Sequence, residues 1–167
     1  IMALDKQIFD LVLRLHKQNF FDQVKSVVDM GDQDLNLTYE NLKKNLSYLN
    51  DKNLDELIST AKTFPKRPRL STSVLWKMLG IKKTARLDII QLERTKNDTV
   101  DEFLKVDLNF PLEKQIELKT YDLVTDFGNN EHPFNVTEAF KSMHKLCNPN
   151  GYMIINQALY GGNGFYN

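Results

Sequence analysis

The sequence predicts an α/β fold: a mostly parallel sheet of about five strands with helices on both of its faces. Short runs rich in valine, leucine and isoleucine alternate with amphipathic stretches or long connections along the 167 residues. This alternation is typical of parallel sheets, because a parallel strand is reached through a crossover connection, usually a helix. Four of the apolar runs end at or beside an aspartate. The length is sufficient for a single domain with a buried core.

Each expected strand is a short apolar run bounded by turn-forming residues or by an acid. The first contains a valine pair and ends at an aspartate, a methionine and Gly31, which favours a tight turn there. The last follows an Asn-Pro-Asn-Gly turn. In chain order the expected strands cover residues 24–31, 85–90, 103–108, 121–126 and 152–156.

Apolar residues spaced three or four apart predict the helices. Asn135 followed by Glu138 resembles a capping box, which favours the start of a helix at that point. Gly80 is expected just after the end of a short helix, and Pro65 and Pro68 stop the helical turns before them. The expected helices and helical turns cover residues 4–21, 38–49, 54–61, 72–79, 111–118 and 135–147.

The charge balance and the cysteine count narrow the classes of function. Lys plus Arg and Asp plus Glu both number 22, so the formal net charge is 0. This balance argues against an electrostatic nucleic-acid or membrane binder. A basic loop at residues 65–69 precedes a short helix in a faint helix-turn-helix resemblance, so DNA binding stays a minor alternative. Cys147 is the only cysteine, which excludes an internal disulfide and a Cys-rich metal site.

The remaining composition points to a protein without a metal or a membrane partner. The histidines and acids show no spacing typical of metal ligands, so we expect no metal site. No apolar run approaches the roughly 18 residues that cross a bilayer. No secretory leader is recognisable at the start of the sequence, so a cytoplasmic protein is expected.

The acids at the strand ends are the most informative feature of the sequence. Asp29, Asp88, Asp107 and Asp126 each follow or end an expected strand. In a parallel sheet the ligand binds outside the carboxyl ends of the strands, where an acid can accept hydrogen bonds from ribose hydroxyls. Each acid taken singly is equally compatible with a solvated turn or a helix cap. Their joint placement predicts a binding site, with Gly31 allowing close approach of the backbone.

Several of these segments resemble motifs of the class I S-adenosylmethionine-dependent methyltransferases. Residues 27–33, Val-Val-Asp-Met-Gly-Asp-Gln, look like a variant of the first-strand motif, and residues 106–109, Val-Asp-Leu-Asn, resemble the segment after the third strand. Residues 121–132 resemble the fourth-strand motif, and residues 139–152 resemble the helix, turn and strand that follow it. The resemblance covers residues 24–167. It implies a Rossmann-like sheet, S-adenosylmethionine as cofactor and an unidentified methyl acceptor.

The resemblance also implies a role for each matching residue. Asp88 would hold the ribose hydroxyls, and Asp107 with Leu108 would border the adenine, the acid accepting from its exocyclic amine. The remaining residues would face the methionine part or the sulfonium of the cofactor: Asp29, Gly31, Gln33, Asp126, Phe127 and Gly128.

His132 and Glu131, just after the fourth expected strand, are the candidate catalytic residues. A base is needed only when the acceptor loses a proton during methyl transfer, and a histidine can take up a proton near neutral pH. The alternative is that His132 only orders the loop before Pro133.

The chain departs from the family pattern in three places. Gln33 and Leu35 stand where glycine is frequent, which affects the expected cofactor affinity. A single domain over residues 1–167 would comprise an N-terminal helix (1–22), a long helical insertion between the first two strands (32–83) and the rest of the sheet (84–167). The family's last strand hairpin is missing, so we expect a C-terminally truncated sheet with an exposed edge, through which a homo-oligomer could form.

Two other functional classes stay open. One is a noncatalytic methyltransferase-like domain that acts as a protein-interaction module. The other is a nicotinamide dehydrogenase, which is less favoured because no Gly-x-Gly-x-x-Gly motif follows the first strand.

Overall fold

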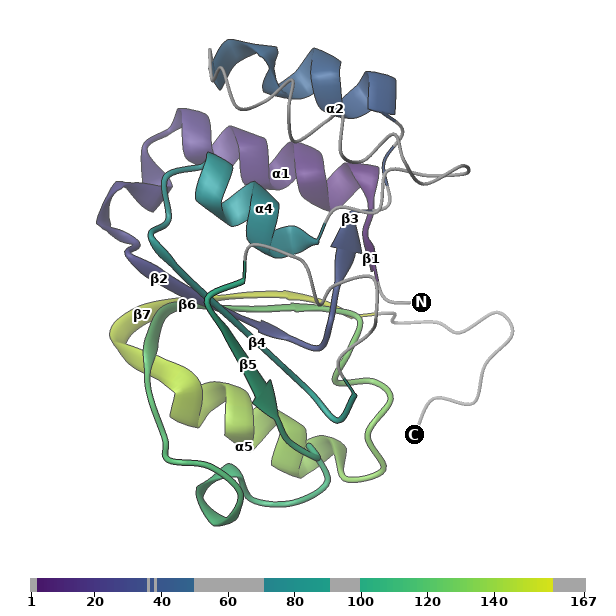
Figure 1. Ribbon diagram of the computed structural model, residues 1–167, viewed down its shortest axis with the longest axis vertical. Helices are drawn as coiled ribbons and strands as arrows, with labels where there is room; N and C mark the ends of the chain where they lie inside the picture. The colour runs from purple at the N-terminus through teal and green to yellow at the C-terminus, as the bar shows by residue number, and fades with distance from the viewer. Residues whose placement is uncertain (1–2, 36, 38, 50–70, 91–99, 158–167) are drawn as a thin grey trace.

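A single five-stranded parallel sheet forms the centre of the molecule (Figure 1). The computed structural model describes residues 3–35, 37, 39–49, 71–90 and 100–157. All four strand pairings in the sheet are parallel. The strand order is β5 (Glu102–Lys105), β4 (Lys83–Asp88), β2 (Ser26–Met30), β6 (Tyr121–Phe127) and β7 (Cys147–Asn156). This arrangement confirms the predicted α/β class and is consistent with a Rossmann-like fold.

Helices cover both faces of this sheet, as the sequence predicts (Figure 1). One face carries α1 (Lys6–Lys17), α2 (Tyr39–Leu46) and α4 (Thr72–Met78), with the 3-10 turns η1 (Phe20–Gln23) and η2 (Ser47–Leu49). The other face carries α5 (Val136–Leu146) and the 3-10 turn η4 (Leu112–Lys114). A small parallel pair of β1 (Ala3–Leu4) and β3 (Asp34–Leu35), which the sequence pattern did not indicate, stands apart from the main sheet. None of the helices in the described ranges has the length and apolarity to span a membrane.

Alternating side chains of the strands supply two separate cores. In β2, Val27 packs into the core beneath α1 and α4, whereas Val28 and Met30 pack into the core beneath α5. Successive side chains of a strand point to opposite faces, and a sheet covered on both sides buries both sets. This explains why β2 and β6 are almost continuously buried.

The helix ends follow the expected local chemistry. The Asn135 side chain accepts from the N–H of Glu138 at 3.1 Å and caps α5, which confirms the predicted start of that helix. Asp5 does the same for α1 by accepting from the N–H of Ile8 at 3.0 Å. Gly80 follows α4 with a φ of 89°, a left-handed conformation that favours glycine, as expected.

One predicted helix is wrong, and a predicted turn is part of a strand. The segment 111–118 forms only the 3-10 turn η4. Its chain is held by Gln115, whose Nε2 donates to the carbonyl of Asp107 at 2.8 Å, so side-chain bonds replace a helical ladder. The expected turn at residues 148–151 lies within β7, where the register against β6 shifts and Asn150 has a φ of 66°. The helical turns expected at residues 54–61 and the basic loop at 65–69 lie outside the described residues.

Candidate functional site

A pocket of about 260 Å³ opens at the carboxyl ends of the strands. It lies beside the point where the strand order changes direction, between β2 and β6, which is where open α/β sheets bind ligands. The strand ends and the loops after them supply its walls: Asp88, Ile89, Val106, Asp107, Leu108, Asn109, Asn129, His132 and Pro133.

Asp88, the last residue of β4, is held by backbone amides on two sides. Its Oδ2 accepts from the N–H of Asp32 at 2.9 Å, and its Oδ1 accepts from the N–H of Ile89 at 2.7 Å. A carboxylate has about four acceptor positions. The half-buried Asp88 is therefore fixed in orientation and still has acceptor capacity at the pocket.

Asp107 is oriented by one of its two carboxylate oxygens. Its Oδ1 accepts from the backbone N–H of Asn109 at 2.9 Å and from the Asn109 side chain at 2.8 Å. The N–H of Asp107 donates to Gln115 Oε1 at 2.8 Å, which attaches the start of the loop after β5 to the end of η4. No residue in the described ranges donates a hydrogen bond to Oδ2 of Asp107, so this oxygen is an available acceptor in the pocket wall.

Asn109 also joins the two loops that enclose the pocket. The N–H of Asn135 donates to Asn109 Oδ1 at 2.9 Å, and Nδ2 of Asn135 donates to the Asn109 carbonyl at 3.3 Å. The loop after β5 is thereby attached to the loop between β6 and α5. The Asp-Leu-Asn segment contained the signal for this link, but the sequence analysis gave Asn109 no role of its own.

A buried ion pair fixes the position of Asp32, whose backbone N–H donates to Asp88. Arg86 Nη1 lies 2.5 Å from Asp32 Oδ1, and the two side chains are 1% and 0% exposed. Arg86 also donates through Nη2 to Ser73 at 2.8 Å and to Ser71 at 3.2 Å. Because the N–H of Asp32 donates to Asp88, the pair positions the acid at the pocket. Sequence reasoning missed this network, although an arginine within an apolar strand was a visible signal.

Asp29 lies on the α4 side of the sheet, away from the pocket lining. Its buried carboxylate accepts hydrogen bonds from Trp76 Nε1 at 2.9 Å and from the hydroxyls of Thr72 and Thr125. Burial raises the pKa of Asp29, although these hydrogen bonds oppose the rise. The acid therefore attaches α4 and β6 to β2, and its acceptor positions are used inside the protein.

Asp126 is fully buried beneath the turn that follows β6. Its Oδ1 accepts from the N–H of Asn129 at 2.8 Å, and its Oδ2 accepts from the N–H of Asn130 at 3.3 Å. Burial raises the pKa of Asp126 to about 6, against the lowering by these amides. Phe127, the last residue of β6, is buried in the core beneath α4, and Gly128, in the turn, has a φ of 84°.

The turn after β2 contacts the turn after β6. Gly31 has a φ of 89°, and a Cβ at this position would lie 2.6 Å from Asn129 Oδ1. Gln33 Nε2 donates to the carbonyl of Met30 at 2.6 Å, and this hydrogen bond spans the turn after β2. Gln33 is 1% exposed.

The two candidate catalytic residues differ in their placement. His132 lines the pocket, and its side chain is 53% exposed, so it is accessible to a second substrate. Glu131 is not among the lining residues; its Oε1 lies 3.9 Å from His132 Nε2.

The structure thus brings together part of the expected site. Asp88, Asp107, Leu108 and His132 line one pocket. The other expected residues lie outside its lining, in the turns and cores beside it: Asp29, Gly31, Gln33, Asp126, Phe127, Gly128 and Glu131. Within the described part of the chain, no group of three or more His, Cys, Asp or Glu residues could hold a metal ion.

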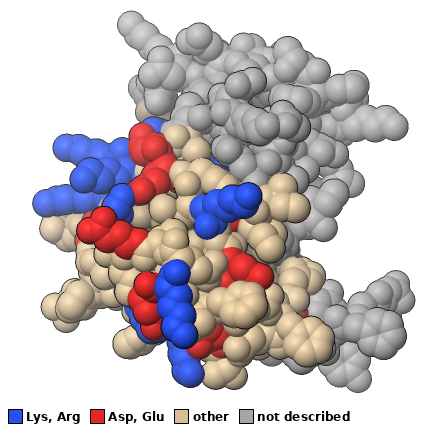
Figure 2. Space-filling view, turned by 60° about the horizontal axis from the view of Figure 1, so that its bottom comes forward, with Lys and Arg blue, Asp and Glu red and all other residues tan. Residues whose placement is uncertain are grey.

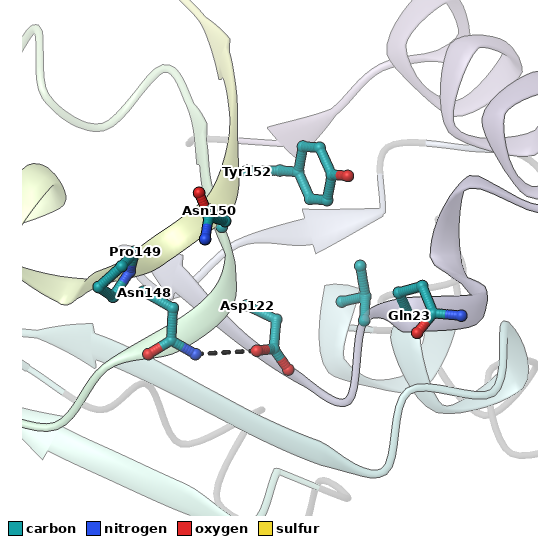
Figure 3. Close-up of a pocket in the computed structure, with 8 residues that line it drawn as sticks. Gln23, Asp122, Asn148, Pro149, Asn150 and Tyr152 are labelled. Atoms are coloured by element: carbon teal, nitrogen blue, oxygen red, sulfur yellow. Dashed lines mark hydrogen bonds between the residues drawn. The ribbon is translucent and has the colours of Figure 1, made fainter.

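A second hollow of about 440 Å³ lies at the opposite, amino end of the strands (Figure 3). Tyr152 and Gln23 lie on different sides of it, and Asn148 donates to Asp122 Oδ1 at 2.8 Å. Oδ2 of Asp122 accepts from Ser26 Oγ at 3.0 Å and from two backbone amides. Burial alone would raise the pKa of Asp122, but these hydrogen bonds together lower it. The acid is therefore a structural joint between β2, β6 and β7.

The face shown in Figure 2 carries Lys and Arg side chains among Asp and Glu side chains over its described part. In the described part of the chain, two Lys–Glu pairs are in direct contact: Lys145 lies 2.7 Å from Glu113, and Lys119 lies 2.6 Å from Glu102. Mixed charge of this kind does not provide the single-sign field that attracts a polyanion.

No family model, curated protein or solved structure matches the chain. Its function is therefore inferred from the residues of the pocket.

Proposed function

We propose that this chain is an S-adenosylmethionine-dependent methyltransferase, or the cofactor-binding part of one, acting on an unidentified acceptor. One observation carries the proposal: a single pocket joins Asp88, at the end of β4, to Asp107 and Leu108, after β5. These are the positions expected to border the ribose and the adenine of the cofactor. The order of the strands supports it as well, because ligands of such sheets bind at this edge.

The chemistry of the pocket fits the adenosine half of the cofactor. Asp88 has spare acceptor capacity for ribose hydroxyls, and Asp107 Oδ2 can accept from the exocyclic amine of adenine. Ile89 and Leu108 supply apolar walls for the base. The volume of 260 Å³ lies just below the roughly 300–1,000 Å³ of ligand pockets. It therefore suits one part of a long ligand.

Bound S-adenosylmethionine would supply a methyl group activated on a sulfonium. The chain's own contribution is to align the adenosine and to exclude water from the reacting centre. His132, exposed at the pocket wall, can take a proton from an acceptor that must lose one. An acceptor that carries no proton at its nucleophilic atom needs no such base.

Calorimetric titration with adenosine and inosine tests whether Asp107 accepts a hydrogen bond from the exocyclic amine of adenine. Asp107→Asn keeps the Oδ1 acceptor that Asn109 uses and turns Oδ2 into an amide donor. Adenosine should then bind at least about tenfold more weakly, since a charge-assisted hydrogen bond contributes about 1.5–3 kcal/mol. Inosine, which presents a carbonyl in place of the amine, should bind more tightly than before.

Asp10→Asn, an exposed acid of α1, is the matched control and should leave both affinities unchanged. S-adenosylmethionine and S-adenosylhomocysteine are titrated in parallel. Absence of heat with all adenosyl ligands at concentrations on the order of 1 mM would reject the proposal, because it leaves at most about 4 kcal/mol of binding free energy.

A second candidate is a noncatalytic domain that pairs with another copy of itself through the sheet edge. The edge strand β7 contains no charged residue, and Tyr152, Met153 and Ile155 are exposed along it. Uncharged edge strands pair readily with other strands. A dimer in sedimentation velocity that Ile155→Lys dissociates, together with no adenosyl binding, would favour this candidate over the first.

A further inference from the structure

Asn129 stands between the pocket and the turn that follows β2. The residue is 7% exposed and lines the pocket. A Cβ on Gly31 would lie 2.6 Å from Asn129 Oδ1 and 2.7 Å from its Cγ, so the carboxamide occupies the space above Gly31. The Asn129 side chain therefore lines the pocket and packs against the β2 turn at the same time.

The Asn129 carboxamide makes no hydrogen bond to any residue in the described ranges. Its backbone, in contrast, is fixed on both sides. The N–H donates to Asp126 at 2.8 Å, and the carbonyl accepts from the N–H of His132 at 3.0 Å. The side chain can therefore rotate while the turn stays in place. The polar atoms of the carboxamide are not among the buried atoms that lack a partner, so they are accessible at the pocket, where a ligand group can meet them.

Two other amides, on the turns after β2 and β6, are buried and have unmet hydrogen bonds. Gln33 Oε1, after β2, has no partner among the described residues. The same holds for Nδ2 and Oδ1 of Asn130, which is fully buried beside Asn129. One of these amides lies after β2 and the other after β6, so both turns beside Asn129 carry unused hydrogen-bonding capacity.

We infer that Asn129 is a specificity-determining residue, which separates adenosine from adenosine derivatives that carry a long polar substituent on the ribose. The inference rests on the proposed function. Adenosine enters the pocket without moving Asn129, whereas a long substituent directed toward Gly31 enters only after the carboxamide has rotated away. The rotated carboxamide then faces the polar groups of the substituent.

The test compares two ligands on the same proteins by calorimetry. Asn129→Ala and the less severe Asn129→Ser are titrated with adenosine and with S-adenosylhomocysteine. If the closed position accounts for about nine-tenths of the molecules, removing it should strengthen binding of S-adenosylhomocysteine by roughly tenfold. Because Asn129 also lines the adenosine pocket, the affinity for adenosine is the reference against which the affinity for S-adenosylhomocysteine is compared in each variant. Asn45→Ala is the matched control, since Asn45 bonds only within α2 through the carbonyl of Asn41 at 2.7 Å.

The ratio of the two affinities is the decisive readout, because a general loss of stability would weaken both ligands together. An increased ratio in either Asn129 variant, absent from Asn45→Ala, supports the assignment. Adenosine binding with an unchanged ratio overturns the role of Asn129 and leaves the proposed function standing. Failure of adenosine to bind the unmodified chain overturns both.

Discussion

Neutralising Asp32 should destabilise the protein more than any surface charge of the same kind. The substitution Asp32→Asn leaves Arg86, which is 1% exposed, without its carboxylate at 2.5 Å. Ser71 and Ser73 still accept hydrogen bonds from Arg86, but these hydroxyls carry no charge that would replace the lost carboxylate.

The expected loss is about 3–5 kcal/mol of the free energy of unfolding, the usual cost of removing one partner of a buried ion pair. That is a large part of the roughly 5–15 kcal/mol that stabilises an ordinary domain. Lys6 and Asp10 provide the control, because they are also 2.5 Å apart but their side chains are 59% and 39% exposed. Asp10→Asn should therefore cost about 0.5 kcal/mol or less.

Urea unfolding followed by circular dichroism measures both losses, and the double variant Asp32→Asn with Arg86→Met completes the cycle. The double variant should be more stable than Asp32→Asn alone, because it no longer buries the Arg86 charge without the Asp32 carboxylate. A loss below about 1 kcal/mol for Asp32→Asn, or strict additivity in the double variant, would refute the reasoning. Adenosine titration of the same proteins adds a functional readout, since the N–H of Asp32 holds Asp88.

Two further predictions concern the turns beside the pocket. Gly31→Ala should lower the free energy of unfolding by at least about 1–2 kcal/mol, measured by urea unfolding, because the φ of Gly31 is 89°. The new Cβ would also clash with the Asn129 side chain, and in an Asn129→Ala background only this steric part of the loss should disappear. Equal losses in both backgrounds would show that the Asn129 contact is absent in solution. For Asp126 the pKa rises from 3.8 to about 6, so the folded protein retains a proton that the unfolded chain releases. The free energy of unfolding should therefore fall by about 2 kcal/mol between pH 4 and 6 relative to Asp126→Asn, measured by unfolding at each pH. A flat difference across this range would contradict the assignment.

Local patterns in the sequence were sufficient to identify most of the sheet and its helices. The apolar runs of β2 and β6 are recognisable because both faces of the sheet are covered, and Asn135 marks the start of α5. The prediction of a helix at 111–118 was wrong because Gln115 bonds back to Asp107 across the loop, a contact between positions that periodicity does not relate.

The expected binding acids divide into two groups for a reason that the sequence did not reveal. Asp88 and Asp107 lie at or beyond the last residue of their strands and reach the pocket. Asp29 lies one residue before the end of β2 on the α4 side, where Trp76 and Thr72, more than forty positions away, use its oxygens. One step along a strand changes the face to which a side chain points.

The order of residues along the chain was enough to establish the α/β class, the approximate strands and helices, and the concentration of acids at strand ends. These features depend on near neighbours, whose periodicity and turn chemistry are visible in the sequence. Packing of distant segments decided which acids share a pocket, that Arg86 pairs with Asp32, and that Asn129 covers Gly31. Such contacts depend on how the sheet is assembled in space, because the partners come from separate strands and turns.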